Sequence, residues 1–224
     1  MDRIAGADAV PRPGPVAAAP SRPILALGHG ASGSAASMAP HVAGLRARGI
    51  DARAVNLPKG RAERAIPVFA ALLAADVAYS AADGRVAVGP AGQLPIAVGG
   101  HSFGGRVASL AAADACDAGR PPLALVLLSY PLHPPGRRDD WDARTAHWPR
   151  LTCPVLLLSG SSDPFATPAL LERALAERLP AAELVTYPRL GHTLAPVLDD
   201  VLDRVAAFVL DARSRGTPDR TRST

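Results

Sequence analysis

The chain is poor in the residues that build disulfide, metal and redox sites. Only two of its 224 residues are cysteines, Cys116 and Cys153. Their separation in the sequence matches neither a metal-binding nor a redox spacing. We therefore expect two reduced thiols in the core rather than a disulfide bridge.

Long hydrophobic runs are also missing. No apolar stretch has the roughly 20 residues that span a bilayer, and residues 1–22 are rich in Pro, Ala and Arg without the apolar block of a signal peptide. The length and the 48% hydrophobic content suit one globular domain. We expect a soluble, cytoplasmic protein whose domain covers 23–210, between disordered tails at 1–22 and 211–224.

Lysine is nearly absent, since Lys59 is the only one, and the net charge of +4 is modest. The preference for arginine over lysine, together with abundant Ala and Pro, is typical of a GC-rich bacterial genome. The tail at 211–224 is basic, but it is short, mixed in sign and free of aromatic residues. It therefore does not predict a nucleic-acid partner.

Apolar, strand-like segments alternate with segments of helical length. Strands are predicted near 23–28, 51–56, 95–100, 123–129, 154–159 and 183–187, and helices near 34–48, 62–79, 104–117, 168–179 and 196–210. This alternation predicts an α/β fold in which about six mostly parallel strands carry helices on both faces. Right-handed connections then place the C-terminal ends of all strands along one edge of the sheet.

The most informative motif follows the third predicted strand and reads Gly100-His101-Ser102-Phe103-Gly104. A helix-like segment begins at once, so the motif predicts a sharp strand-to-helix turn with Ser102 exposed at its tip, a nucleophile elbow. The glycines suit positions where a Cβ would collide with a neighbouring strand or helix. The alternative is a glycine-rich turn whose serine only caps the helix.

Two later residues complete an arrangement for nucleophilic catalysis. Asp163 follows the buried strand pattern at 154–159, and His192 follows the strand pattern at 183–187. Asp163, at the tip of one strand, supplies the acid, and His192, after the next, supplies the base for a Ser102 nucleophile. Taken alone, an Asp before a proline is commonly a turn residue or a helix cap, and a His beside a glycine commonly lies at the surface.

An early glycine-rich segment, Gly28-His29-Gly30-Ala31-Ser32-Gly33, follows the first predicted strand. Its glycines allow the backbone to turn toward the serine, so we assign an oxyanion hole to the N–H groups of Ala31 and Phe103. A phosphate-binding loop is the competing interpretation, but no Gly-Lys-Ser/Thr follows and the spacing differs from a dinucleotide fingerprint.

The connection at 131–153 leaves the sheet at the predicted catalytic edge. It holds both tryptophans, Trp141 and Trp148, and also His133. We predict that these three residues contact substrate from a pocket wall or a minimal lid. A purely structural role is an equal alternative for the tryptophans and the stronger one for His133, against the turn at Pro134-Pro135.

These motifs together resemble the α/β-hydrolases, and in particular the dienelactone-hydrolase-like group. The likeness covers about 23–210 and rests on the segment at 28–33, on Gly99-Gly100-His101-Ser102-Phe103-Gly104-Gly105-Arg106 and on Tyr130-Pro131-Leu132-His133-Pro134-Pro135-Gly136. The last run is similar to the branch that includes a testis-expressed protein and the hydrolase-like domain of an NSL chromatin-complex subunit. Classical dienelactone hydrolases use a cysteine where this chain has Ser102.

The resemblance implies the α/β-hydrolase fold and a serine hydrolase. We predict cleavage of a small-molecule carboxylic ester or thioester through an acyl-enzyme on Ser102, without a metal or organic cofactor and without a nucleic-acid or membrane partner. The alternatives are a protein-interaction module that keeps the fold with little or no turnover, and an acyltransferase.

Overall fold

A six-stranded parallel sheet forms the centre of the domain. The computed structural model describes residues 22–74, 77–79, 86–88, 96–134 and 136–216. The strands follow the order β2-β1-β5-β6-β7-β8, and every neighbouring pair is parallel. Their bounds are β1 Ile24–Gly28, β2 Asp51–Val55, β5 Ala97–His101, β6 Leu125–Leu128, β7 Val155–Gly160 and β8 Glu183–Tyr187. The predicted sheet is confirmed, and each strand end lies within two residues of its predicted position.

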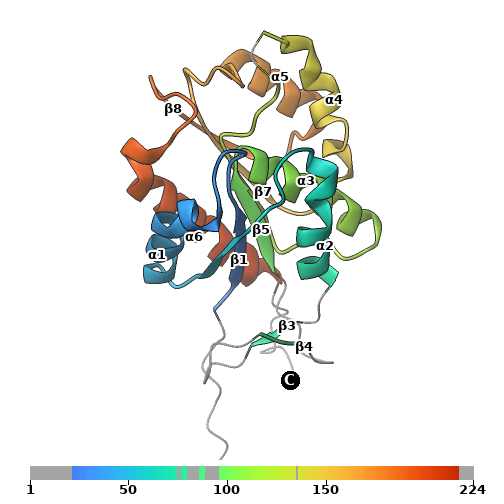
Figure 1. Ribbon diagram of the computed structural model, residues 1–224, viewed down its shortest axis with the longest axis vertical. Coiled ribbons are helices and arrows are strands. Elements are labelled where there is room, and N and C mark those ends of the chain that lie inside the picture. Colours follow the sequence, from blue (N-terminus) through green and yellow to red (C-terminus); the bar gives the residue numbers. More distant parts are fainter. Residues whose placement is uncertain (1–21, 75–76, 80–85, 89–95, 135, 217–224) are drawn as a thin grey trace, which may run out of the picture.

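Helices cover both faces of this sheet (Figure 1). The α-helices are α1 Ala39–Ala47, α2 Ile66–Ala74, α3 Phe103–Asp117, α4 Trp141–Thr145, α5 Pro168–Arg178 and α6 Leu198–Gly216. Short 3-10 helices lie at Ala35–Met38, Ala62–Arg64, Arg138–Asp140, Trp148–Arg150 and Ala195–Val197. In Figure 1, α1 and α6 lie on one side of the strands, whereas α2 and α3 lie on the other.

The central strands are apolar on both faces because both faces are buried. On β6, Leu125 and Leu127 join the core beneath α2, α3 and α5, whereas Val126 and Leu128 join the core beneath α1 and α6. This alternation follows from the two-residue period of a strand. It explains why the strand segments appear in the sequence as continuous apolar runs.

Two predicted boundaries were wrong. The helix expected at 62–79 is α2, which ends at Ala74, and the chain then forms β3 (Val77–Tyr79), which pairs antiparallel with β4 (Val86–Val88). Both short segments contain β-branched residues, which favour strands over helices. The helix expected to end at 210 continues as α6 to Gly216, with Ala212 still buried. The remainder of the predicted tails, 1–21 and 217–224, lies outside the described residues.

The two cysteines are free thiols, as predicted. Cys153 is buried and Cys116 is half-buried, and the Thr152 N–H donates to Cys116 Sγ over 3.5 Å. Burial raises the pKa of Cys153 to about 12, so this thiol stays protonated and unreactive at neutral pH.

A buried imidazole makes the stability of the domain depend on pH. His147 Nε2 lies 2.8 Å from Ser109 Oγ, and that hydroxyl donates to the Arg106 carbonyl. Burial first, and then the positive charges of Arg106 and Arg150, lower the pKa of His147 from 6.5 to about 4. The unfolded chain therefore binds this proton more tightly than the folded chain. The stabilisation by neutral His147 is complete above about pH 6.5 and is lost as the pH falls toward 4.

We expect a His147→Gln variant to lose this titration. Relative to the variant, the wild-type free energy of unfolding should fall by about 2 to 3 kcal/mol between pH 7 and pH 4.5. Urea unfolding at several pH values in this range measures the difference, in which the other titrating groups cancel. A difference that does not change with pH would contradict this role of His147.

Candidate active site

Ser102 lies at the turn between β5 and α3, where its backbone adopts φ 52° and ψ −115°. Its N–H donates to the Leu128 carbonyl over 2.8 Å, which ties the turn to the neighbouring strand. Such a conformation is costly for a residue with a side chain, and it is found where a rigid surrounding structure imposes it. The predicted elbow is therefore present in the backbone.

The glycines on either side of Ser102 allow this turn to pack against β1. A Cβ on Gly100 would lie 2.4 Å from the Gly28 carbonyl oxygen, and a Cβ on Gly104 would lie 2.3 Å from the same atom. Both contacts are with a backbone atom, which cannot move aside by a change of rotamer as a side chain could. The steric reason that the sequence suggested for these glycines is confirmed, with Gly28 of β1 as the neighbour.

Asp163 lies in the turn after β7 and is 2% exposed. Its Oδ1 accepts the Phe165 N–H over 2.9 Å, while Oδ2 lies 2.8 Å from His192 Nδ1. The carboxylate is thus held by the backbone of its own loop. Its second oxygen remains directed at the imidazole.

His192 follows β8, and its loop is joined to the Asp163 loop by backbone hydrogen bonds. The Ser161 N–H donates to Tyr187 O over 2.9 Å, and the Ser162 N–H donates to Leu190 O over 2.8 Å. The His192 ring also packs against the Phe165 ring, with centroids 4.5 Å apart. These contacts fix the position of His192 relative to Asp163.

The three predicted side chains form one hydrogen-bonded line. His192 Nε2 lies 2.8 Å from Ser102 Oγ, and His192 Nδ1 lies 2.8 Å from Asp163 Oδ2. Because a carboxylate accepts hydrogen bonds, Nδ1 carries the hydrogen and Nε2 presents its lone pair to the hydroxyl. This arrangement can take a proton from Ser102 as the oxygen attacks an electrophile.

Two further histidines hold the backbone around this line, and sequence reasoning gave neither of them a role. His29 is buried, and its Nδ1 donates to the Gly30 carbonyl while its Nε2 accepts the Leu57 N–H over 3.0 Å. His101 Nε2 lies 2.9 Å from the His192 carbonyl oxygen. Burial is the main cause that lowers the pKa of His101, which favours the neutral ring as the donor of that hydrogen bond.

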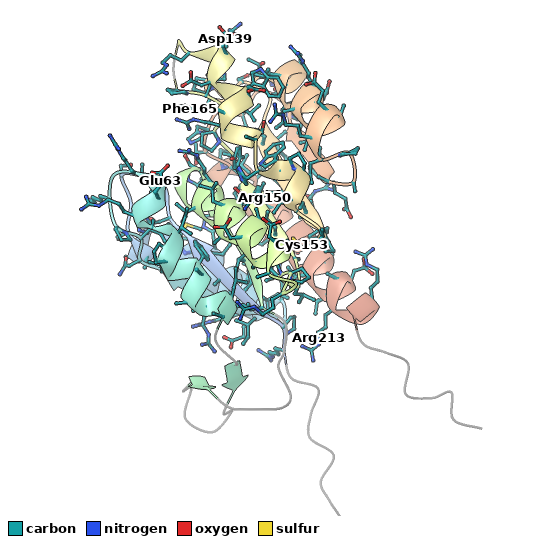
Figure 2. All side chains as sticks on the ribbon, turned by 90° about the vertical axis from the view of Figure 1, so that its right-hand side faces the viewer. Glu63, Asp139, Arg150, Cys153, Phe165 and Arg213 are labelled. Carbon is teal, nitrogen blue, oxygen red and sulfur yellow. The ribbon has the colours of Figure 1, made fainter. Side chains whose placement is uncertain are left out.

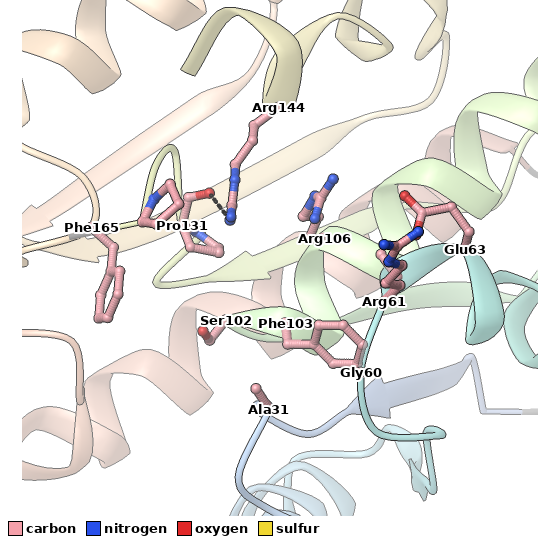
Figure 3. Close-up of a pocket in the computed structure, with 12 residues that line it drawn as sticks. Ala31, Gly60, Arg61, Glu63, Ser102, Phe103, Arg106, Pro131, Arg144 and Phe165 are labelled. Carbon is pink, nitrogen blue, oxygen red and sulfur yellow. Dashed lines mark hydrogen bonds between the residues drawn. The ribbon is translucent and has the colours of Figure 1, made fainter. Parts of the chain in front are cut away.

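A cavity of about 610 Å³ opens beside Ser102. It is lined by Ala31, Gly60, Arg61, Ala62, Glu63, Ser102, Phe103, Arg106, Pro131, Pro134, Arg144 and Phe165. Figure 3 shows Ala31, Ser102 and Phe103 together on one side of it. In Figure 2, Phe165 lies nearer the end of the domain that carries Asp139, whereas Arg213 lies toward the opposite end. Among the lining residues, Ala31 follows β1, Ser102 follows β5 and Phe165 follows β7. The cavity thus lies at the edge where the parallel strands end.

The connection at 131–153 contributes to this cavity, but through other residues than predicted. Trp148 is fully buried in the core and packs edge-on against Tyr130, with ring centroids 5.2 Å apart. Trp141 is buried beneath the guanidinium groups of Arg173 and Arg178. The prediction that the tryptophans line the pocket was wrong, because a large apolar ring is stabilised more by full burial than at an open pocket wall.

His133 also lies outside the cavity lining. It is buried, its Nδ1 donates to the Pro134 carbonyl over 2.9 Å, and its backbone N–H donates to Phe165 O. These contacts correct the predicted substrate contact and match the structural alternative. His133 shapes the turn that brings Pro134 and Phe165 to the cavity.

The sequence analysis did not predict several of the residues that line the cavity. Arg106 lies one helical turn after Ser102, and Phe165 lies two residues after Asp163, so proximity along the chain could have indicated both. Arg144, Arg61 and Glu63 come from segments whose position depends on the whole fold.

Among the described residues, no group of three or more His, Cys, Asp or Glu side chains could hold a metal ion. In the same part of the chain, no helix is both long and apolar enough to cross a membrane.

Comparison with known families gives one match that covers most of the chain. A family model described as an alpha/beta hydrolase domain matches residues 20–209. No curated protein matches the sequence.

Solved structures with a similar fold include enzymes named as lipases, esterases and thioesterases. The monoacylglycerol lipase of Paleococcus ferrophilus has a TM-score of 0.66 at 13% identity, over 86% of this chain and 96% of that one. Est1E from Butyrivibrio proteoclasticus has a TM-score of 0.62 at 19% identity, over 87% of this chain and 90% of that one. The type II thioesterase BorB from the borrelidin biosynthetic cluster has a TM-score of 0.57 at 23% identity, over 86% of this chain and 93% of that one. At these identities the likeness shows the fold.

Proposed function

Because the chain belongs to the alpha/beta hydrolase domain family, we propose that it is a serine hydrolase that cleaves a carboxylic ester or thioester. The observation that carries this proposal is the line of two 2.8 Å contacts from Ser102 through His192 to Asp163. The names of the lipase and the thioesterase with similar folds support an ester or thioester as the substrate.

In the proposed reaction, Ser102 Oγ attacks the carbonyl carbon while His192 Nε2 takes the hydroxyl proton. Asp163 keeps the hydrogen on His192 Nδ1 and stabilises the imidazolium. The imidazolium then protonates the leaving alcohol or thiol, and the acyl group remains on Ser102. In the second half, His192 activates a water molecule that releases the acid.

We assign the oxyanion hole to the N–H groups of Ala31 and Phe103. Phe103 is the first residue of α3, and the first N–H groups of a helix have no partner within the helix. Ala31 lies on the same side of the cavity as Phe103, on the loop where the His29 side chain bonds the Gly30 carbonyl (Figure 3). Two preorganised donors at this point would stabilise the charge that develops on the carbonyl oxygen.

Within the family, we place the chain in the dienelactone-hydrolase-like branch. The support is the run from Tyr130 to Gly136, which lies on the connection that lines the cavity through Pro131 and Pro134. Ser102 in place of the cysteine of classical dienelactone hydrolases favours ester or thioester cleavage over that lactone reaction.

The test of the proposed function is turnover of matched oxygen and sulfur esters. We expect saturable release of 4-nitrophenol from 4-nitrophenyl acetate, or of thiol from S-phenyl thioacetate, with free acetate as the other product. Acetate measured by NMR separates hydrolysis from transfer to an added alcohol. Absence of turnover with both substrates, in protein shown to be folded by circular dichroism, would contradict the proposal.

A further inference from the structure

Arginine side chains outnumber carboxylates in the lining of the cavity beside Ser102. Arg61, Arg106 and Arg144 contribute to its lining, against the single carboxylate of Glu63. Building on the proposed function, we propose that the substrate carries an anionic group, a carboxylate or a phosphate, which Arg106 and Arg144 bind while Ser102 attacks.

Arg106 is placed by the same turn that places the nucleophile. It lies in the first turn of α3, and its backbone N–H donates to the Ser102 carbonyl over 3.1 Å. The side chain is half-buried, and its Nε is buried without a hydrogen-bond partner among the described residues. A buried donor of a charged group is costly when it lacks a partner.

Arg144 reaches the same cavity from a different helix, α4. Its carbonyl accepts the Tyr130 hydroxyl over 2.8 Å, and the Tyr130 ring packs on Trp148, so the backbone of Arg144 is fixed. Its guanidinium makes one long hydrogen bond, 3.4 Å from Nη1 to the Pro131 carbonyl (Figure 3). Within the part of the chain that the structure describes, its other four N–H donors have no hydrogen-bond partner and can bind an anion.

Electrostatics supports the same assignment. Burial first, and the positive charge of Arg106 second, lower the pKa of Arg144. Tyr130 and Asp140 act in the opposite direction and raise this pKa, but the Asp140 carboxylate already bonds Arg137 at 3.2 Å. An anion between the two guanidinium groups would relieve their repulsion.

Arginines elsewhere in the described part of the chain are commonly paired. Arg48, Arg150, Arg178 and Arg204 each contact an aspartate, although these sites are partly exposed. Within the same residues, neither Arg106 nor Arg144 has a carboxylate within 4 Å. The planar guanidinium fork suits both carboxylate and phosphate oxygens. The cavity is therefore suited to an anion at a fixed place beside the nucleophile.

The first measurement compares esters that differ only in one negative charge. On the acyl side, the pair is 4-nitrophenyl hydrogen glutarate and its methyl ester. On the leaving-group side, it is 3-acetoxyphenylacetate and its methyl ester. In at least one pair, wild type should have a kcat/KM about tenfold or more higher for the anionic member, equal to about 1.4 kcal/mol. The responding pair identifies which part of the substrate carries the charge.

Variants then locate the source of this preference. In Arg106→Gln and in Arg144→Gln, the anionic-to-neutral ratio of kcat/KM should fall about tenfold, whereas Arg106→Lys and Arg144→Lys should keep part of it. Arg120→Gln removes the same charge beyond the far end of α3 and should leave the ratio unchanged. Inhibition of 4-nitrophenyl acetate turnover by butanoate and by propyl phosphate distinguishes a carboxylate site from a phosphate site.

Two results would overturn the anionic substrate. One is a wild-type ratio within twofold of unity in both ester pairs, and the other is a ratio that neither glutamine variant changes. If wild type hydrolyses no ester at all, the proposed function fails, and the anion site is tested separately by binding. NMR titration of the Ser102→Ala protein with propyl phosphate and with butanoate should then show affinity for one of them that Arg106→Gln weakens about tenfold. No binding of either anion would refute the site.

Discussion

Replacing Ser102 by alanine should lower kcat for ester hydrolysis on the order of a million-fold, to a rate near the background. The hydroxyl oxygen of Ser102 is the only protein atom that attacks the carbonyl carbon in the proposed mechanism, and without it His192 Nε2 would have no hydroxyl proton to take. Substrate binding should change little, because alanine still fits the strained turn between β5 and α3. The measurement is the initial rate with the best substrate of the wild-type screen.

A serine outside the cavity provides the control. Ser37→Ala removes an exposed hydroxyl that bonds the Ser34 carbonyl, and it should retain wild-type kcat. If purified Ser102→Ala protein, free of wild-type contamination, kept even a hundredth of the wild-type rate, another nucleophile would be responsible.

The second large effect is expected for Asp163→Asn, with kcat about ten-thousandfold lower. To keep the hydrogen bond from the Phe165 N–H, the amide oxygen must take the place of Oδ1. The NH₂ group then faces His192 Nδ1, which must accept rather than donate. The imidazole hydrogen therefore moves to Nε2, and the ring cannot take the proton of Ser102.

This variant should remain folded, because asparagine has almost the same shape as aspartate. Thermal unfolding checks that point, and exposed Asp139→Asn is the matched control that should keep full activity. A loss of less than tenfold in kcat for Asp163→Asn would assign the acid to another residue.

Most of the site could be predicted because it depends on local sequence and on chain order. The elbow requires glycines at 100 and 104, which the backbone of Gly28 confirms. Asp163 and His192 each follow a strand pattern, and a parallel sheet brings such strand ends to one edge. The hydrogen bonds that join their loops then fix the spacing, although the sequence could not reveal those bonds.

The missed features depend on packing between distant segments. Trp141 and Trp148 could equally have lined a cavity or filled the core, and only the position of Tyr130, Arg173 and Arg178 decides for the core. Likewise, one arginine from α3 and one from α4 share a cavity because of how those helices pack. The helix α6 continues beyond residue 210, and Ala212 in this extension is buried. The mixed charges of the sequence around Ala212 gave no indication of that burial.

The most direct test of the central claim is the position of covalent labelling by a fluorophosphonate, which reacts with an activated serine whatever the natural substrate. We expect a single adduct, mapped by peptide mass spectrometry to Ser102, strongly reduced in Asp163→Asn and absent in Ser102→Ala. Folded wild-type protein that takes up no label, or that carries it on a residue other than Ser102, would contradict the role of Ser102 as the activated nucleophile.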